Sequence, residues 1–252
     1  MNWQSLVTIK FFCTKILRVP ATSLSPSSTR YKFLVLPLII LTGILAFSNT
    51  YGQDNNQQQQ DYLKAITTRS EKIVNVLEID DSDKYHTVLN ELVDQYSRIN
   101  TIHEQSKEVI DQIERQSLSK EATEEAVKQQ EAKKKEQLEQ RHAKFIAQLK
   151  NNLSEDQLEK VKDGMTYRVF PITYAGYLDM LPSLTTEQKN QVYVWLKEAR
   201  ELAMDAESAE KKHAVFGKYK GRINNYLSQA GYDLKKESKA WQERIKERQK
   251  NK

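Results

Sequence analysis

Helix-breaking residues are scarce through most of this 252-residue chain. After residue 60 it contains only five glycines and two prolines. Apolar side chains recur there at intervals of three and four residues, the period of an α-helix that buries one face. Little of the sequence is left for strands, so we expect residues 61–252 to form a single all-helical domain, an all-α helical bundle.

A seam of apolar side chains predicts a long helical hairpin. Alternating spacings of three and four, the heptad pattern of a coiled coil, relate Leu89, Leu92, Tyr96, Ile99, His103, Ser106, Ile110 and Ile113. The charged helix at residues 119–150 is expected to return antiparallel, which gives a coiled-coil-like hairpin over about residues 83–150 and a route to a homo-oligomer. His103 and Ser106 form a polar layer in this seam. We expect His103 to be a hydrogen-bonded core residue that fixes the register of the seam, in preference to a metal ligand.

Two predicted helix starts share one capping pattern. Ser154 and Thr185 are each followed three residues later by a glutamine, which is the capping-box arrangement. Between these starts, residues 166–182 are rich in aromatic side chains and are predicted to be a short non-helical loop or strand-like segment. These aromatic side chains either stack on sugar rings or plug one end of the bundle. Secondary candidates for ligand binding lie here: Tyr167, Arg168, Tyr174 and Asp179.

The N-terminal residues have the layout of an export signal. An apolar run of 15 residues at 33–47 follows Arg30 and Lys32 and precedes a small residue, Gly52. The run is shorter than the ~20 residues that span a membrane. We therefore assign residues 1–52 to an N-terminal extension and signal peptide cleaved near Gly52, with a retained anchor as the alternative, and residues 53–60 to a polar flexible linker. The protein is expected in the periplasm or outside the cell, in contact with membrane only through the leader.

Charge and cysteine content exclude several functions. Residues 1–52 hold 5 basic and no acidic side chains, so residues 53–252 carry 34 of each and no net charge. This balance removes the usual electrostatic case for nucleic-acid binding. The one cysteine, Cys13, precedes the apolar run, so the domain has no disulfide and no cysteine-based zinc site. The histidines share no metal-ligand spacing and no cofactor motif occurs, so we predict neither a metal nor a cofactor.

The segment HAVFGKYKGRINNYLSQAGY at residues 213–232 is the candidate functional surface. Gly217 and Gly221 lie on one side of its predicted helix, where each costs about 1 kcal/mol relative to alanine. Either close packing or a ligand would explain them. Residues 209–252 hold 13 basic and 5 acidic side chains, which either serve an acidic ligand or only balance the acidic remainder. The candidate ligand-binding residues are His213, Lys218, Tyr219, Lys220, Arg222, Asn224, Asn225 and Tyr226.

Several blocks of the sequence resemble a known family. They are KDGMTY at residues 162–167, LTTEQK at 184–189, EARELAMD at 198–205, and the later run KKHAVFGKYKGRINNYLSQAGYDLKK. Together with NELVDQYSRINTIHEQ at residues 90–105, they resemble the secreted bacterial family called domain of unknown function 3826, over about residues 61–245. The resemblance implies a sugar-binding protein found beside polysaccharide-utilisation systems of Gram-negative bacteria. It carries over no catalytic residue.

Three functions remain open from the sequence. We expect an exported, non-catalytic protein that binds a carbohydrate, preferably an acidic glycan such as a uronate-containing polysaccharide. A structural or chaperone-like periplasmic helical module is the first alternative, which an exposed contiguous apolar surface would favour. The second alternative is a polysaccharide-degrading glycosidase or lyase without a recognisable motif, with its site among Asp163, Asp179, Asp205, His213, Tyr219 and Arg222.

Overall fold

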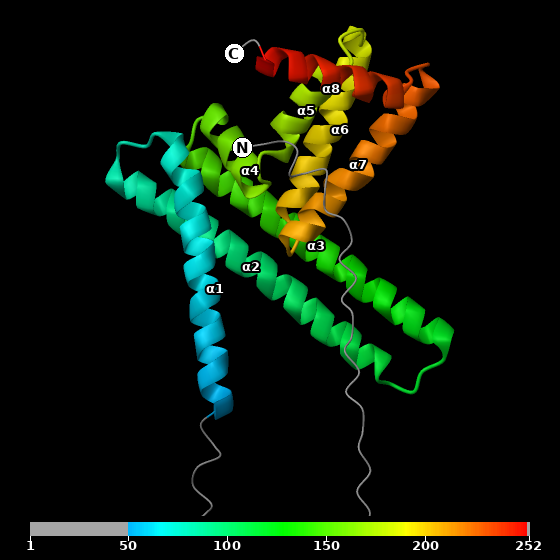
Figure 1. Ribbon diagram of the computed structural model, residues 1–252. Helices are drawn as coiled ribbons and strands as arrows, with labels where there is room; N and C mark the ends of the chain where they lie inside the picture. Colours follow the sequence, from blue (N-terminus) through cyan, green and yellow to red (C-terminus); the bar gives the residue numbers. More distant parts are fainter. Residues whose placement is uncertain (1–49, 251–252) are drawn as a thin grey trace, which may run out of the picture. The chain divides into compact units, whose positions relative to one another are not determined.

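The structure, a computed structural model, describes residues 50–250, and side chains from residue 57 onward. The apolar run at residues 33–47 therefore lies outside the described residues. Helices account for all the regular structure in residues 50–250, which confirms the predicted all-α class (Figure 1). None of these helices is both long enough and apolar enough to cross a membrane. The elements are α1 (Thr50–Val74), η2 (Asn75–Leu77), α2 (Ser82–Glu114), α3 (Lys120–Asn152), α4 (Glu155–Met165), α5 (Val169–Met180), α6 (Thr186–Met204), α7 (Ala209–Gln229) and α8 (Leu234–Lys250).

Polar caps set where the helices begin. The two predicted capping boxes are confirmed at α4 and α6: the hydroxyls of Ser154 and Thr185 accept hydrogen bonds from the backbone N–H groups of Gln157 and Gln188. Each glutamine side chain accepts the backbone N–H of its cap residue in return. Because the first N–H groups of a helix have no partner within it, these contacts stabilise both starts.

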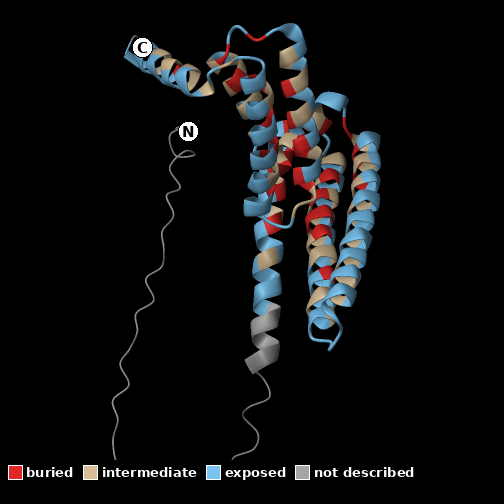
Figure 2. Ribbon diagram, turned by 90° about the vertical axis from the view of Figure 1, so that its right-hand side faces the viewer, coloured by how far each residue is buried: buried red, intermediate tan, exposed pale blue. Residues whose placement is uncertain are grey.

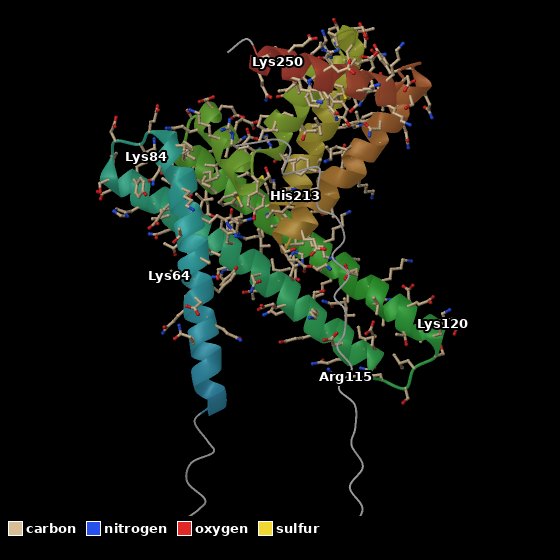
Figure 3. The ribbon with its side chains drawn as sticks, viewed as in Figure 1. Lys64, Lys84, Arg115, Lys120, His213 and Lys250 are labelled. Atoms are coloured by element: carbon tan, nitrogen blue, oxygen red, sulfur yellow. The ribbon has the colours of Figure 1, made fainter. Side chains whose placement is uncertain are left out.

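The two longest helices form the predicted hairpin. Helices α2 and α3 pack against each other along their length and are joined by a short loop between Arg115 and Lys120 (Figure 3). The predicted seam is confirmed in part, since it buries Leu92, Tyr96, Ile99 and Ser106. His103 is hydrogen-bonded as expected, since its Nε2 atom lies 2.9 Å from the backbone oxygen of Asp205 at the end of α6. This hydrogen bond attaches the hairpin to the C-terminal helices.

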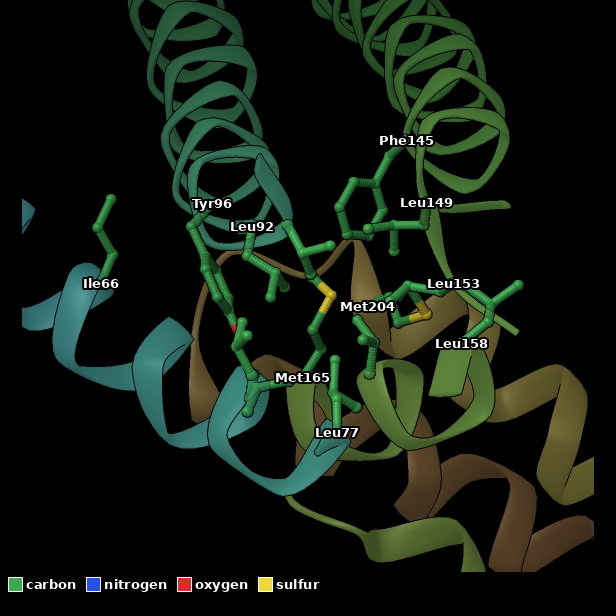
Figure 4. Packing of buried hydrophobic residues seen from close by; sticks show 14 residues of the cluster. Ile66, Leu77, Leu92, Tyr96, Phe145, Leu149, Leu153, Leu158, Met165 and Met204 are labelled. Atoms are coloured by element: carbon green, nitrogen blue, oxygen red, sulfur yellow. The ribbon is translucent and has the colours of Figure 1, made fainter. Parts of the chain in front are cut away.

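Two apolar cores hold the helices together, and buried residues line the inner faces of the helices (Figure 2). The first core joins helices α1, α2, α3 and α4 around Leu77, Leu92, Phe145 and Met165 (Figure 4). The second lies among α5, α6 and α7. Met204, at the end of α6, packs into the first core, so α6 is the element common to both.

Two predictions of irregular structure differ from the observed fold. The aromatic segment was predicted to be non-helical, but residues 169–180 form helix α5. Pro171 is compatible with this helix because it lies in the first turn, where its missing N–H would have no partner. Phe170 and Tyr177 are buried in the second core, so these aromatic side chains plug the bundle. Residues 53–60, expected as a linker, lie within α1, consistent with the helix propensity of glutamine.

Candidate functional site

Helix α7 positions the candidate surface. Ser208 caps its first turn, and its hydroxyl accepts the backbone N–H of Lys211 at 3.1 Å. The apolar side of α7 packs in the second core through Phe216, Tyr219, Ile223 and Leu227. With this side turned inward, the candidate residues other than Tyr219 fall on the two flanks and the outer face of α7, and His213 lies near the start of the helix (Figure 3).

The flank toward α6 brings a cation together with two aromatic rings. The guanidinium carbon of Arg222 lies 4.3 Å from the ring centroid of Trp195. Tyr226 meets the same indole edge-on, with 5.3 Å between ring centroids and 86° between ring planes. The Arg222 side chain is 55% exposed, and its nearest carboxylate oxygen, on Glu198, is 4.0 Å away. We call Trp195, Arg222 and Tyr226 the Trp195 platform.

Tyr219 lies beside the platform but inside the core, since only 9% of it is exposed. Burial, together with a hydrogen bond to Glu198, raises the pKa of Tyr219 to about 12. Its hydroxyl is therefore protonated at neutral pH. The residue contributes packing, and it presents little surface to a ligand.

The flank toward α5 is occupied by a contact within the protein. The Tyr177 hydroxyl donates to the side-chain oxygen of Asn224 at 2.7 Å and lies 3.5 Å from the backbone oxygen of Lys220. Asn224 therefore orients the buried Tyr177, while the side chain of Lys220 is exposed. Asn224 and Arg222, two residues apart, serve opposite sides of the helix.

The outer face of α7 is open. Lys218 and Asn225 are exposed, and a Cβ atom added to Gly217 or Gly221 would meet nothing within 4 Å among the described residues. Close packing therefore does not explain the two glycines. Both leave the backbone of this face accessible, which is the other interpretation of the pair.

His213 lies apart from the platform and pairs with a secondary candidate. Its ring stacks on Tyr167 with 5.8 Å between centroids and 16° between planes. Tyr167 and Arg168 have φ angles of 57° and 56°, in the left-handed region that costs a side chain about 1–2 kcal/mol. Backbone hydrogen bonds hold this turn, including Arg168 N–H to the Asp163 oxygen at 2.7 Å.

The other two secondary candidates have structural contacts. Tyr174 packs edge-on against Tyr193 within the aromatic cluster of α5 and α6. Asp179 anchors α8, because its carboxylate accepts hydrogen bonds from Trp241 Nε1 at 2.6 Å and from Arg248 at 2.8 Å. The hydrogen bond from Arg248, then that from Trp241, lowers the pKa of Asp179.

Sequence reasoning did not identify the buried charge network that joins the two cores. At its centre is Arg200, which is 0% exposed. Its guanidinium donates to Asp163 at 2.7 Å, to Glu159 at 2.6 Å and to Glu201 at 3.1 Å. Glu201 also accepts from Lys162 at 3.0 Å. The network therefore connects α4 with α6.

Histidine 142 extends the network to the hairpin. Its Nδ1 atom lies 2.9 Å from Asp205 and its Nε2 atom 3.4 Å from Glu201. Hydrogen bonds to Asp205 and Glu201 raise the pKa of His142 to about 9. Burial raises the pKa of Glu201, but hydrogen bonds and charges from His142, Lys162 and Arg200 outweigh it and lower the pKa to about 2. At neutral pH His142 is thus protonated and Glu201 ionised.

Two of the residues considered for a hidden catalytic site belong to this network, and the buried Lys212 packs beside it. Asp163 and Asp205 are engaged by Arg200 and His142. Lys212, at the start of α7, is buried and donates to the backbone oxygens of Ala203 and Met204, both at 2.9 Å. Burial lowers the pKa of Lys212 to about 8. Across the described residues, no group of histidine and carboxylate side chains is arranged to hold a metal ion.

The family comparison agrees with the blocks in the sequence. A family model described as "Protein of unknown function (DUF3826)" matches residues 63–247. These residues include the helical hairpin, the charge network, the Trp195 platform and most of α8. No curated protein matches the chain. Because the family model covers most of the sequence, the chain belongs to this family of proteins of unknown function.

Proposed function

We propose that this chain is an exported, non-catalytic carbohydrate-binding protein that holds an acidic glycan at the Trp195 platform. The observation that carries the proposal is the pairing of the exposed Arg222 with the Trp195 ring at 4.3 Å. Its place beside a polysaccharide-utilisation system is part of the proposal and rests on the family resemblance.

The platform offers both kinds of contact that an acidic sugar uses. The apolar C–H face of a sugar ring stacks on an aromatic ring, and Trp195 and Tyr226 are side by side and partly exposed. A uronate carboxylate accepts two parallel hydrogen bonds from a guanidinium. In the proposed mode of binding, one sugar residue makes both contacts, with its carboxylate on Arg222 and its C–H face on the exposed part of the aromatic pair.

The partner that Arg222 has within the protein is a weak one. Glu198 is 4.0 Å away, and the two side chains are 51% and 55% exposed. Exposed pairs of this kind contribute between nothing and about 1 kcal/mol. A ligand carboxylate in bidentate geometry would therefore compete effectively with Glu198 for the guanidinium.

The surrounding surface supports an extended anionic ligand. The accessible backbone at Gly217 and Gly221 and the exposed Lys218 and Asn225 continue the platform along α7. Residues 209–252 carry 13 basic and 5 acidic side chains, so the region attracts a polyanion. The proposal of binding without cleavage rests on the sequence, in which no recognisable catalytic motif occurs.

Affinity electrophoresis tests the function. The purified protein is run through gels that contain a uronate polymer, a neutral polysaccharide or neither. We expect retardation by the uronate polymer, reduced by added salt because screening weakens exposed charge pairs. Equal mobility in all gels would contradict the proposal, and oligosaccharide released during incubation would assign the protein to the enzymes.

Export is tested separately. The proposed leader at residues 1–52 should be missing from protein recovered from the native cell envelope, so its mass should correspond to a chain that begins near Gln53. An intact leader in the recovered protein would instead indicate a membrane anchor.

A further inference from the structure

A second group of cationic and aromatic side chains lies away from the Trp195 platform. We define the Tyr167 cluster as Arg69, Tyr96, Tyr167 and His213. The guanidinium carbon of Arg69 lies 5.5 Å from the ring centroid of Tyr96 and 5.9 Å from that of Tyr167, and His213 stacks on Tyr167. The four residues come from α1, α2, the turn after α4 and α7. Tertiary folding, and not the spacing of one helix, therefore brings them together.

The cluster contains donors that the protein itself does not use. Arg69 is exposed and makes no ion pair with any residue between 57 and 250. The hydroxyl of Tyr96 is buried and has no hydrogen-bond partner in the described part of the chain. Buried polar groups nearly always have a partner, and one without a partner is destabilising. A bound acceptor would satisfy both donors.

The turn that carries Tyr167 is strained but well held. Tyr167 and Arg168 adopt left-handed backbone angles, and the Thr166 hydroxyl fixes the start of the turn by donating to the Lys162 backbone oxygen at 2.8 Å. Strained backbone of this kind is concentrated at functional sites. Here it accompanies an arrangement in which the partly exposed Tyr167 ring contacts both His213 and Arg69.

The charges around the cluster favour an anion. Burial raises the pKa of Tyr96, whereas the charge of Arg69 lowers it. Burial is the main cause that lowers the pKa of Lys212. The charge of Asp205 raises this pKa, and the charge of Arg69 lowers it, which shows that the two cations are close to each other. The hydroxyl of Tyr96 therefore stays protonated beside a cation, which makes it a donor.

We propose that the Tyr167 cluster binds an oxyanion, either a carboxylate or a phosphate group, at a site distinct from the Trp195 platform. Arg69 provides the charge-assisted hydrogen bonds and Tyr96 the buried hydroxyl donor. The exposed rings of Tyr167 and His213 border the anion and provide apolar surface for the molecule that carries it. The site takes a small anionic molecule or an anionic group on a larger one.

Calorimetric titration of the full-length protein tests the proposal with three probes: glucuronate, inorganic phosphate and glucose. We expect at least one anion to bind saturably and glucose not to bind. Arg69→Ala should weaken the binding of that anion by roughly 10-fold or more, the effect of losing a hydrogen bond to a charged group. Arg98→Ala, at an exposed arginine already paired with Asp94 at 3.2 Å, is the matched control and should leave binding unchanged.

Tyr96→Phe separates binding from stability. It removes only the hydroxyl that has no partner, so it should preserve or raise the melting temperature and still weaken anion binding. Binding of glucuronate alone would point to a sugar acid, and binding of phosphate alone to a phosphorylated ligand or free phosphate; either result supports an oxyanion site. Absence of saturable binding by both anions would overturn the proposal. So would binding that Arg69→Ala and Tyr96→Phe leave unchanged, whatever the outcome at the Trp195 platform.

Discussion

The guanidinium of Arg200 donates a 2.7 Å hydrogen bond to the carboxylate of Asp163 with no part of the arginine side chain exposed. Burial raises the pKa of Asp163, and the contact with Arg200 opposes this shift only in part. The pair and its neighbours Glu159 and Glu201 link the two apolar cores. Ion pairs at this depth contribute little to stability compared with apolar replacements, but breaking one is costly.

Arg200→Met should therefore lower the free energy of unfolding by about 3–5 kcal/mol, because it leaves several partly buried carboxylates without their counter-charge. Urea denaturation followed by circular dichroism measures the change. Arg98→Ala, which removes an exposed arginine from an i,i+4 pair, is the control and should cost roughly 0.5 kcal/mol or less. Similar losses in the two variants would show that the network is not structural.

His142 should make stability depend on pH. Its pKa is raised to about 9 in the folded protein, so its contribution is fully present below the unfolded pKa of about 6.5 and is lost as the pH rises through about 9. The full shift corresponds to at most about 3.4 kcal/mol. The lowered pKa of Glu201 reflects in part the same hydrogen bond to His142, so the two shifts are not added. Lys212, with its pKa lowered to about 8, acts in the opposite sense above pH 8.

Comparing the parent with His142→Gln cancels the effect of Lys212. The difference in unfolding free energy between the two proteins should be largest near pH 6 and should disappear above about pH 9. Denaturant titrations at four or five pH values measure it. A difference that stays constant over this range would mean that His142 is not protonated in the fold.

Substitution by alanine should have opposite effects on stability at the glycines of α7 and at Gly164 of α4. At Gly217 and Gly221 a Cβ would meet open space, so alanine should stabilise the protein by about 0.5–1 kcal/mol at each position. At Gly164 a Cβ would lie 2.8 Å from Cγ1 of Ile73. Overpacking costs about 1–3 kcal/mol, and we expect a net loss there. Thermal melting distinguishes the signs, and destabilisation by Gly217→Ala would contradict the open outer face.

The sequence predicts those parts of the fold that local chemistry decides. The helical class follows from the scarcity of glycine and proline, and the starts of α4 and α6 from Ser154 and Thr185, whose capping partners lie three residues away. Helix α5 differs from the predicted loop because aromatic content does not distinguish a loop from a buried helix. The position of Pro171 in a first turn, where proline is compatible with a helix, is the signal that favours the helix.

The sites were less predictable, because they depend on contacts between distant residues. Arg222 was identified from its own segment, but Trp195 lies on another helix and nothing in its local pattern distinguishes it from a core residue. Arg200 reads as an ordinary charged residue of an amphipathic helix, although it is completely buried. The contact between Arg69 and Tyr167 joins residues almost a hundred positions apart, which no periodicity reveals.

Arg222 and Trp195 are proposed to form a binding surface for an acidic glycan. Calorimetric titration of a uronate polymer into the parent, Arg222→Ala and Arg98→Ala tests this surface, with each protein first shown to be folded by thermal melting. We expect Arg222→Ala to lose about 1–3 kcal/mol of binding free energy, the size of a hydrogen bond to a charged group, and Arg98→Ala to bind like the parent. A folded Arg222→Ala protein that binds the uronate polymer as tightly as the parent would contradict this proposal.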